Sequence, residues 1–242
     1  MHHDAEHGRA VYQTSTMGAL LDGVYDGDMT VAELLSHGDF GLGTFNGLDG
    51  EMLVLDGVCY QLRADGSATV AESHARTPFA TVTWFHTDHA FEVHTATNRA
   101  ALLAEIDAAL DSANLIYAIR ITGRFATVRT RTVAAQHQPY LPLAQATDSQ
   151  QESEFADVDG TLAGYRMPDY EQGVAVAGYH LHYLDAAHRS GGHALDYVLA
   201  DGRIEISVRS ELHLALPTSA AFLHADLNHG DAGAEIHHSE GG

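Results

Sequence analysis

The sequence predicts an α+β protein dominated by strands, with two lobes built on mixed and antiparallel sheets and few helices. Short apolar runs alternate with turn signals along much of the chain, glycine is common at 23 residues, and few segments have helical periodicity. With 242 residues, of which 45% are hydrophobic, the chain can form one large domain or two small ones.

The first helix signal lies within residues 25–41. Thr30 and Glu33 have the spacing of a capping box, and Gly38 can end the helix. Residues 43–71 then predict strands joined by tight turns, with turn signals at Asn46-Gly47 and Asp49-Gly50.

Residues 89–133 predict a strand, a helix near 98–112, and two further strands broken at Gly123. The helix has a core-facing stripe at the spacing of one helical face, formed by Leu102, Leu103, Ile106 and Leu110.

The polar segment 144–160 is the best candidate for a linker or a long surface loop. It separates a predicted N-terminal β-rich α/β lobe, residues 1–145, from a C-terminal β lobe, residues 146–242. Mainly antiparallel strands are expected in the second lobe.

The net charge of −21 argues against nucleic acid or an anionic membrane as partner, because both need a basic face. All 12 basic residues are arginine, and lysine is absent. The first residues show no secretory signal, so we expect a cytoplasmic protein. The single cysteine, Cys59, fits a reducing compartment and is expected to be a small buried hydrophobic residue.

Residues 178–197, GYHLHYLDAAHRSGGHALDY, contain four histidines. His180 and His182 are two apart in a predicted strand, so they point to the same face. If 183–192 connects a hairpin, His193 lies opposite His182, and its side chain joins that face. His188 would lie at the loop tip, too far out to join.

Three histidines and an open position form a common catalytic zinc arrangement. Iron, manganese or nickel could occupy the same site. The competing interpretation is an exposed strand face that carries polar histidines by chance, in a chain with 18 histidines.

Three segments, residues 15–62, 123–143 and 178–197, resemble the α-acetolactate decarboxylase family. The most specific match is the ordered stretch GDFGLGTFNGLDGE, and the similarity extends over roughly residues 11–240. The resemblance implies two β-rich α/β lobes, usually a homodimer, and conversion of 2-acetolactate to acetoin and carbon dioxide without an organic cofactor.

The resemblance also implies site residues. The family's three zinc-binding histidines match His180, His182 and His193, the same three that the hairpin argument selects. Its active-site glutamate and threonine match Glu51 and Thr44.

The family's site arginine matches Arg131, with Arg129 as the nearest alternative. A glutamate of its C-terminal tail, which folds back onto the metal, matches Glu240 best, and Glu235 is the alternative.

2-Acetolactate is a β-keto acid with a tertiary hydroxyl, so loss of carbon dioxide leaves an electron pair that needs an acceptor. A lysine imine is impossible in a chain without lysine, which favours a metal. We therefore expect zinc to chelate the keto and hydroxyl oxygens and Arg131 to orient the carboxylate. Glu51, with Glu240 as its partner or alternate, would supply a proton. Thr44 would bind a glutamate or the substrate hydroxyl.

Two other functions remain open at this point. One is a metallohydrolase, in which zinc activates water. The other is a metal-binding protein of this fold without activity.

Overall fold

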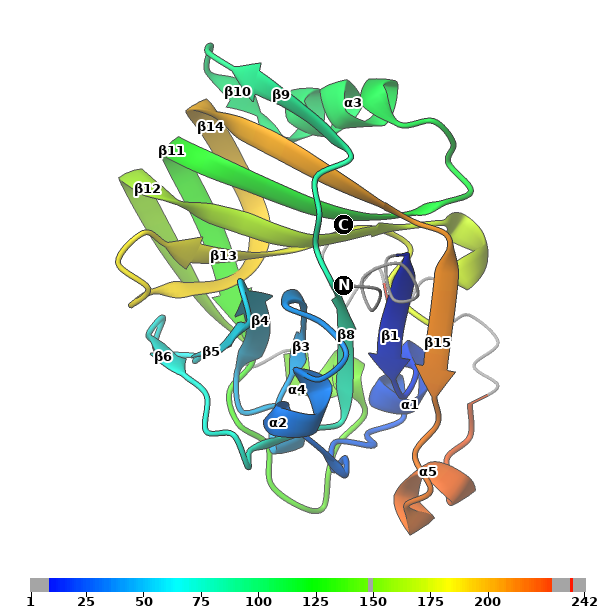
Figure 1. Cartoon of the computed structure of the whole chain (residues 1–242). Coiled ribbons are helices and arrows are strands. Elements are labelled where there is room, and N and C mark those ends of the chain that lie inside the picture. The colour runs from blue at the N-terminus through cyan, green and yellow to red at the C-terminus, as the bar shows by residue number, and fades with distance from the viewer. Residues whose placement is uncertain (1–8, 148–149, 228–235, 237–242) are drawn as a thin grey trace.

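The computed structural model describes residues 9–147, 150–227 and 236. Strands dominate this part of the chain, in one mixed sheet and one antiparallel sheet (Figure 1). The predicted α+β class is therefore confirmed.

Seven strands of the described chain form the first sheet. They are β1 (Ala10–Thr14), β3 (Phe40–Thr44), β4 (Glu51–Leu55), β5 (Val58–Leu62), β6 (Ala68–Val70), β8 (Phe79–Thr83) and β15 (Glu211–Ala215). Their order is β15-β1-β8-β3-β4-β5-β6. Only the β1–β15 pair is parallel, which makes the sheet mixed. A separate pair joins β2 (Met29–Thr30) and β7 (Arg76–Thr77).

Six described strands form the second sheet. They are β9 (His89–Val93), β10 (Thr97–Asn98), β11 (Ile116–Thr132), β12 (Gln151–Met167), β13 (Gly178–Asp185) and β14 (Gly191–Arg209). The main order is β10-β14-β11-β12-β13, and β9 also pairs with β14. Because β13 pairs with both β12 and β14, strands β11, β12, β13 and β14 form a closed ring of paired strands at one end of the sheet.

The helices are short. They are α1 (Met17–Leu21), α2 (Val31–Leu34), α3 (Arg99–Ala109), α4 (Leu143–Ala146) and α5 (Ala220–His224), with 3-10 turns η1 (Asn46–Leu48) and η3 (Asp169–Glu171). Figure 1 shows α3 over the second sheet, on the side away from the first sheet. Leu102 and Ile106 of α3 are buried in the core of that layer.

A second apolar core fills the space between the sheets. Phe40, Leu42 and Leu53 of the first sheet meet Ala163 and Tyr165 of the second. Apolar contact across this layer removes side chains from water on both sheets and fixes how the two sheets pack. The buried histidines of β13 and β14, described below, lie beside this apolar layer.

Several local predictions are confirmed. The capping box of Thr30 and Glu33 begins α2, although the helix ends at Leu34, before Gly38. Turns occur at both predicted dipeptides, where Gly47 has a φ of 66° and Gly50 a φ of 93°. The helix predicted near 98–112 is α3.

Two predictions about strands are wrong. The strand does not break at Gly123, since β11 runs from Ile116 to Thr132. Glycine instead allows the backbone of β11 to approach β14 closely at this position. The segment 144–160 is not a loop. Its second half belongs to β12, whose outer part looks polar because its side chains face solvent.

The boundary between residues 145 and 146 stays a prediction. The sheets combine interleaved segments, since β15 returns to the first sheet after β14. In the described part of the chain no helix combines the length and apolar character needed to cross a bilayer. Cys59 is buried as expected, and burial raises the pKa of its thiol to about 12.

Candidate metal centre and adjoining pocket

The predicted hairpin forms with the predicted register. β13 and β14 are antiparallel, and His182 lies directly opposite His193. The connection is shorter than expected, because β13 continues to Asp185 and β14 begins at Gly191. The i, i+2 spacing of His180 and His182 then places three imidazoles on one face.

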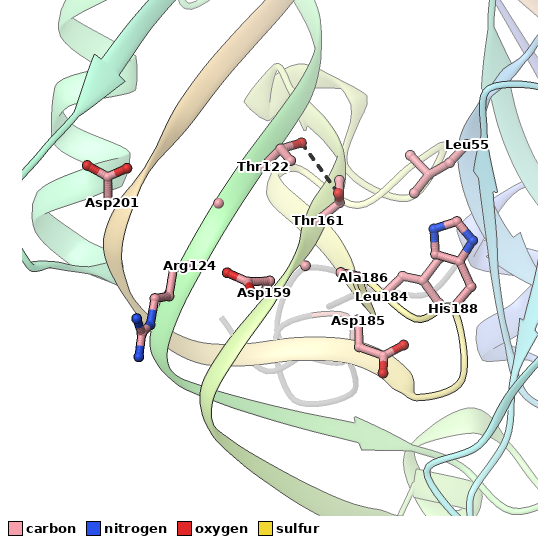
Figure 2. A pocket seen from close by; sticks show the side chains of 12 residues that line it. Leu55, Thr122, Arg124, Asp159, Thr161, Leu184, Asp185, Ala186, His188 and Asp201 are labelled. Carbon is pink, nitrogen blue, oxygen red and sulfur yellow. Dashed lines mark hydrogen bonds between the residues drawn. The ribbon is translucent and has the colours of Figure 1, made fainter.

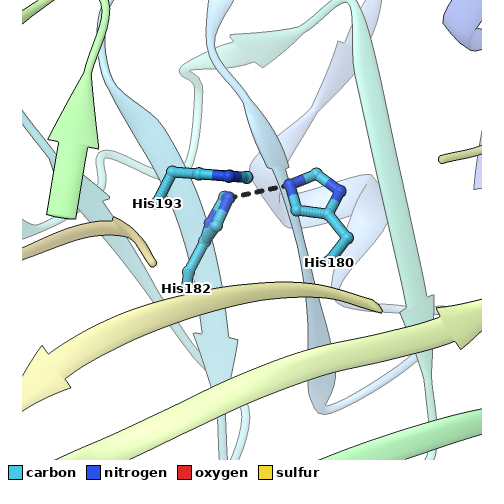
Figure 3. Close-up of side chains that lie close together, drawn as sticks. All are labelled: His180, His182 and His193. Carbon is cyan, nitrogen blue, oxygen red and sulfur yellow. Dashed lines mark hydrogen bonds between the residues drawn. The ribbon is translucent and has the colours of Figure 1, made fainter. Parts of the chain in front are cut away.

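The three imidazoles form a compact, buried cluster (Figure 3). His182 is 0% exposed, His193 4% and His180 9%. One nitrogen from each ring lies within 4.8 Å of the others. The competing interpretation of a solvent-facing row of histidines is therefore wrong.

A backbone carbonyl sets the tautomer of His182. Its Nδ1 lies 2.8 Å from the carbonyl oxygen of Met52, which can only accept, so Nδ1 carries the hydrogen. The Nε2 atom then keeps its lone pair. A backbone partner of this kind commonly orients a metal-binding histidine.

The donor set fits a metal ion. The Nε2 atoms of His180 and His182 are 3.2 Å apart. A tetrahedral ion with metal–nitrogen bonds of about 2.05 Å would separate its ligand nitrogens by about 3.3 Å. Burial, with the charge of Arg131 as a smaller cause, lowers the pKa of His180 to about 3. His180 is therefore neutral at neutral pH, as a metal ligand must be.

Glu51 lies beside this cluster at the start of β4. Its Oε2 is 3.7 Å from Nε2 of His182, and its side chain is 18% exposed. Met52, the next residue, supplies the carbonyl that holds His182. The Glu51 carboxylate and the His182 imidazole are therefore held relative to each other by two adjacent residues of β4, Glu51 and Met52.

Thr44 holds the turn that precedes Glu51. Its hydroxyl donates to the carbonyl oxygen of Gly50 at 2.9 Å, and its backbone pairs with Glu51 across β3 and β4. The hydroxyl oxygen can still accept a hydrogen bond. Gln61 supports the same turn from β5 by donating to the carbonyl of Asp49.

Arg131 and Arg129 have different surroundings, although both lie on β11. Arg131 lies opposite His193 on β14, so one row of the sheet contains Arg131, His193 and His182. It is 5% exposed. Arg129 faces solvent and pairs with Glu152, with 3.0 Å between Nη1 and Oε2. The structure thus places Arg131, and not its alternative, beside the histidines.

A small cavity of about 30 Å³ adjoins the cluster. Thr44, Glu51 and Arg131 supply its polar wall, and the remaining lining residues are Leu20, Leu48, Val133, Leu143 and Thr147. Its lining therefore combines two charged side chains with aliphatic ones, next to the histidine cluster.

The predicted tail carboxylates, Glu240 and Glu235, lie outside the described residues. Ile236, which is described, is 2% exposed. It packs in the apolar cluster that contains Leu20, Leu48 and Val133, all of which line the cavity.

A larger hollow of about 520 Å³ lies elsewhere, against the bend of the second sheet (Figure 2). It contains none of the three clustered histidines. His188 lines it and hydrogen-bonds to Tyr60, which confirms that this fourth histidine does not join the cluster. Its other charged residues are Arg124 and three aspartates, of which Asp159 and Asp201 are exposed, as expected for the surface of an acidic chain.

Sequence reasoning did not find Gln150, whose side chain contacts Arg131, or the aliphatic wall of the cavity. Single leucines and valines carry no signal that separates a pocket from a core. Gln150 precedes β12, and the register of β11 and β12 places Glu152, not Gln150, opposite Arg131, so strand pairing alone does not predict this contact.

Together, fold and site define a two-sheet α+β protein with a buried three-histidine site suited to a catalytic metal ion. A family model described as alpha-acetolactate decarboxylase matches residues 11–229. The chain belongs to the alpha-acetolactate decarboxylase family, whose reaction is that of a carboxy-lyase.

Individual relatives agree with this assignment. The alpha-acetolactate decarboxylase of Bacillus subtilis is 46% identical over 231 residues, covering 96% of this chain and 91% of that protein. That of Methylococcus capsulatus is 47% identical over 217 residues, covering 90% and 84%. A crystal structure of the Bacillus subtilis protein matches with a TM-score of 0.95 and 45% identity, covering 96% of this chain and all of that one.

Proposed function

We propose that this chain converts 2-acetolactate to acetoin and carbon dioxide, with a zinc ion held by His180, His182 and His193. The observation that supports this most is the position of Glu51 between three buried histidines and a small cavity: its carboxylate lies 3.7 Å from Nε2 of His182, and with Arg131 it lines the cavity. The relatives at 46% and 47% identity are named for this activity.

Zinc is proposed because three histidines are a common ligand set for a catalytic zinc ion with an open position. When bound, it would supply a Lewis acid for the keto and hydroxyl oxygens of the substrate. The carbonyl of Met52 contributes by holding His182 with Nε2 toward the site.

Arg131 is proposed to bind the substrate carboxylate through two N–H groups. The carbon–carbon bond to this carboxylate breaks, its electron pair stays on the substrate, and the carboxylate leaves as neutral carbon dioxide. Because the negative charge moves away from Arg131 in this step, the arginine serves mainly to orient the carboxylate.

Glu51 is proposed to protonate the carbon from which carbon dioxide has left, which yields acetoin. Its position supports this role, since its carboxylate borders both the histidines and the cavity. Thr44 is proposed to bind a glutamate or the substrate hydroxyl. Glu240 remains the proposed partner or alternate of Glu51, with Glu235 as the alternative.

We also propose that the enzyme is a homodimer in the cytoplasm. The family resemblance supports the homodimer. A single, buried cysteine fits a reducing compartment.

The test is acetoin formation from racemic 2-acetolactate by the purified protein, as isolated, after chelation and after zinc is restored. We expect activity that disappears with the metal and returns with zinc. Metal content, measured on each sample, controls for incomplete chelation.

The same assay separates the alternatives. Bound metal without acetoin in any sample would support a metal-binding protein without activity. Hydrolysis of an ester substrate in place of decarboxylation would support the metallohydrolase. Full activity in a sample shown to be free of metal would contradict the proposed role of zinc.

A further inference from the structure

Two arginines on β11 differ in burial and in the side chains that accept their hydrogen bonds. Arg129 pairs with the carboxylate of Glu152 at 3.0 Å, and the two side chains are 48% and 46% exposed. Arg131, two residues later, is buried, and its Nη1 donates to Oε1 of Gln150 at 2.8 Å. The exposed arginine thus donates to a carboxylate, whereas the acceptor that Gln150 offers to the buried arginine is a neutral amide.

The neutral partner suits an arginine that binds a carboxylate. An amide carbonyl accepts from the guanidinium and fixes its plane, but it adds no negative charge. A glutamate at the same place would occupy the same N–H group and repel an incoming carboxylate. The carboxylate of Glu51 already lines the cavity. A second carboxylate there would add to its repulsion of an anionic substrate.

The position of Gln150 supports a role in orientation. It lies at the entry to β12, the strand that pairs with β11 along its length. Arg131 thus lies between two neighbours: the Gln150 amide, from the part of the chain that leads into β12, and His193 on β14.

We propose that Gln150 is a positioning residue: its amide carbonyl orients the guanidinium of Arg131 toward the substrate carboxylate without adding negative charge to the cavity. This inference rests on the proposed function, because the carboxylate in question is that of 2-acetolactate.

The decisive variant is Gln150→Glu, which keeps the size and the acceptor but adds charge. We expect KM for 2-acetolactate to rise about tenfold to hundredfold, the range that one charge-assisted hydrogen bond supplies. The value of kcat should change much less. The matched control is Glu92→Gln, the reverse change in the exposed pair that Glu92 forms with Arg203, which should leave both constants unchanged.

A binding measurement separates this inference from the reaction. Calorimetry would compare 2,3-dihydroxy-2-methylbutanoate, an unreactive acid, with acetoin, the uncharged product. We expect Gln150→Glu to weaken binding of the acid by the same factor as KM and to leave binding of acetoin unchanged. Thermal unfolding of the variant checks that it is folded.

Three results would overturn the inference: unchanged binding of the acid by Gln150→Glu, equal loss of acid and acetoin binding, or no binding of the acid by the unmodified chain. Absence of acetoin formation by the unmodified chain would instead overturn the proposed function. The calorimetric comparison would still report whether Gln150 controls carboxylate binding.

Discussion

At the scale of single residues, the carbonyl of Met52 connects the two halves of the proposed site. It accepts from Nδ1 of His182, while the preceding residue, Glu51, presents its carboxylate to Nε2 of the same ring. A shift of β4 relative to β13 would therefore disturb the imidazole and the carboxylate together. This coupling would keep Glu51, the proposed proton donor, aligned with His182, a proposed metal ligand on the other sheet.

Replacement of Glu51 tests its proposed role as an acid. We expect Glu51→Gln to lower kcat by roughly 10²–10⁴-fold, because an amide cannot deliver the proton. Zinc content should stay the same, since the three histidines are intact. The measurement is acetoin release together with metal analysis.

A matched control is Glu72→Gln, whose side chain is 79% exposed, and which should keep full activity. A Glu51→Gln variant with the kcat of the unmodified chain would show that another group supplies the proton.

The residues of the site differ in how far the sequence predicts them. The histidines were accessible from strand alternation and one hairpin register, which are local properties. Glu51 and Arg131 could be selected only through the family resemblance, because a glutamate after a turn and an arginine in a strand are ordinary surface residues. Gln150 cannot be selected from the sequence, because the polar segment around it predicts a loop.

At the scale of elements, a row of glycines crosses the second sheet. Gly123 of β11 lies opposite Gly160 of β12 and Gly202 of β14. A Cβ atom at Gly123 would collide with the backbone of β14 at Asp201. At Gly123 and Gly202, β11 and β14 therefore approach each other more closely than side chains would allow, and at Gly160 β12 approaches β13 in the same way.

We expect Gly123→Ala to lower the free energy of unfolding by about 1–3 kcal/mol, because a backbone neighbour cannot move aside cheaply. Denaturant unfolding measures this. The matched control is Gly18→Ala in α1, where the nearest atom to an added Cβ is 3.6 Å away. There the helical preference of alanine should raise stability by up to about 1 kcal/mol. Equal effects of the two changes would contradict this account.

Elements with a local cause were predicted well, and those with a distant cause were not. The capping box, the turns at Gly47 and Gly50, and α3 depend on residues close in sequence. The first half of β12 is a strand because it pairs with β11. Its own sequence is mainly polar and exposed, so it has no apolar alternation that would predict a strand. Pairing of Gly123 with β12 and β14 likewise explains why it does not break β11.

At the scale of the whole molecule, the acidic composition opposes compactness. The net charge is −21, and the ion pairs on the surface, such as Arg203 with Glu92, involve only the 12 arginines as permanent cations. Repulsion among the excess carboxylates is therefore a general cost of folding at low ionic strength.

We expect the melting temperature to rise by a few degrees between low salt and molar sodium chloride, because the screening length falls from about 10 Å at 0.1 M to about 3 Å at 1 M. Sodium chloride is preferred to a sulfate salt, which also strengthens apolar burial. Differential scanning calorimetry measures the shift. An unchanged melting temperature would show that the charges are already balanced locally.

The return of β15 to the first sheet has a consequence for biosynthesis. β15 pairs with β1 from Ala10 opposite Glu211 to Thr14 opposite Ala215, after every strand of the second sheet has been passed. On the ribosome, β1 therefore emerges long before its parallel neighbour exists. The layer that is translated first is the layer that is completed last, and until then the nascent chain exposes the edge of β1 to other polypeptides.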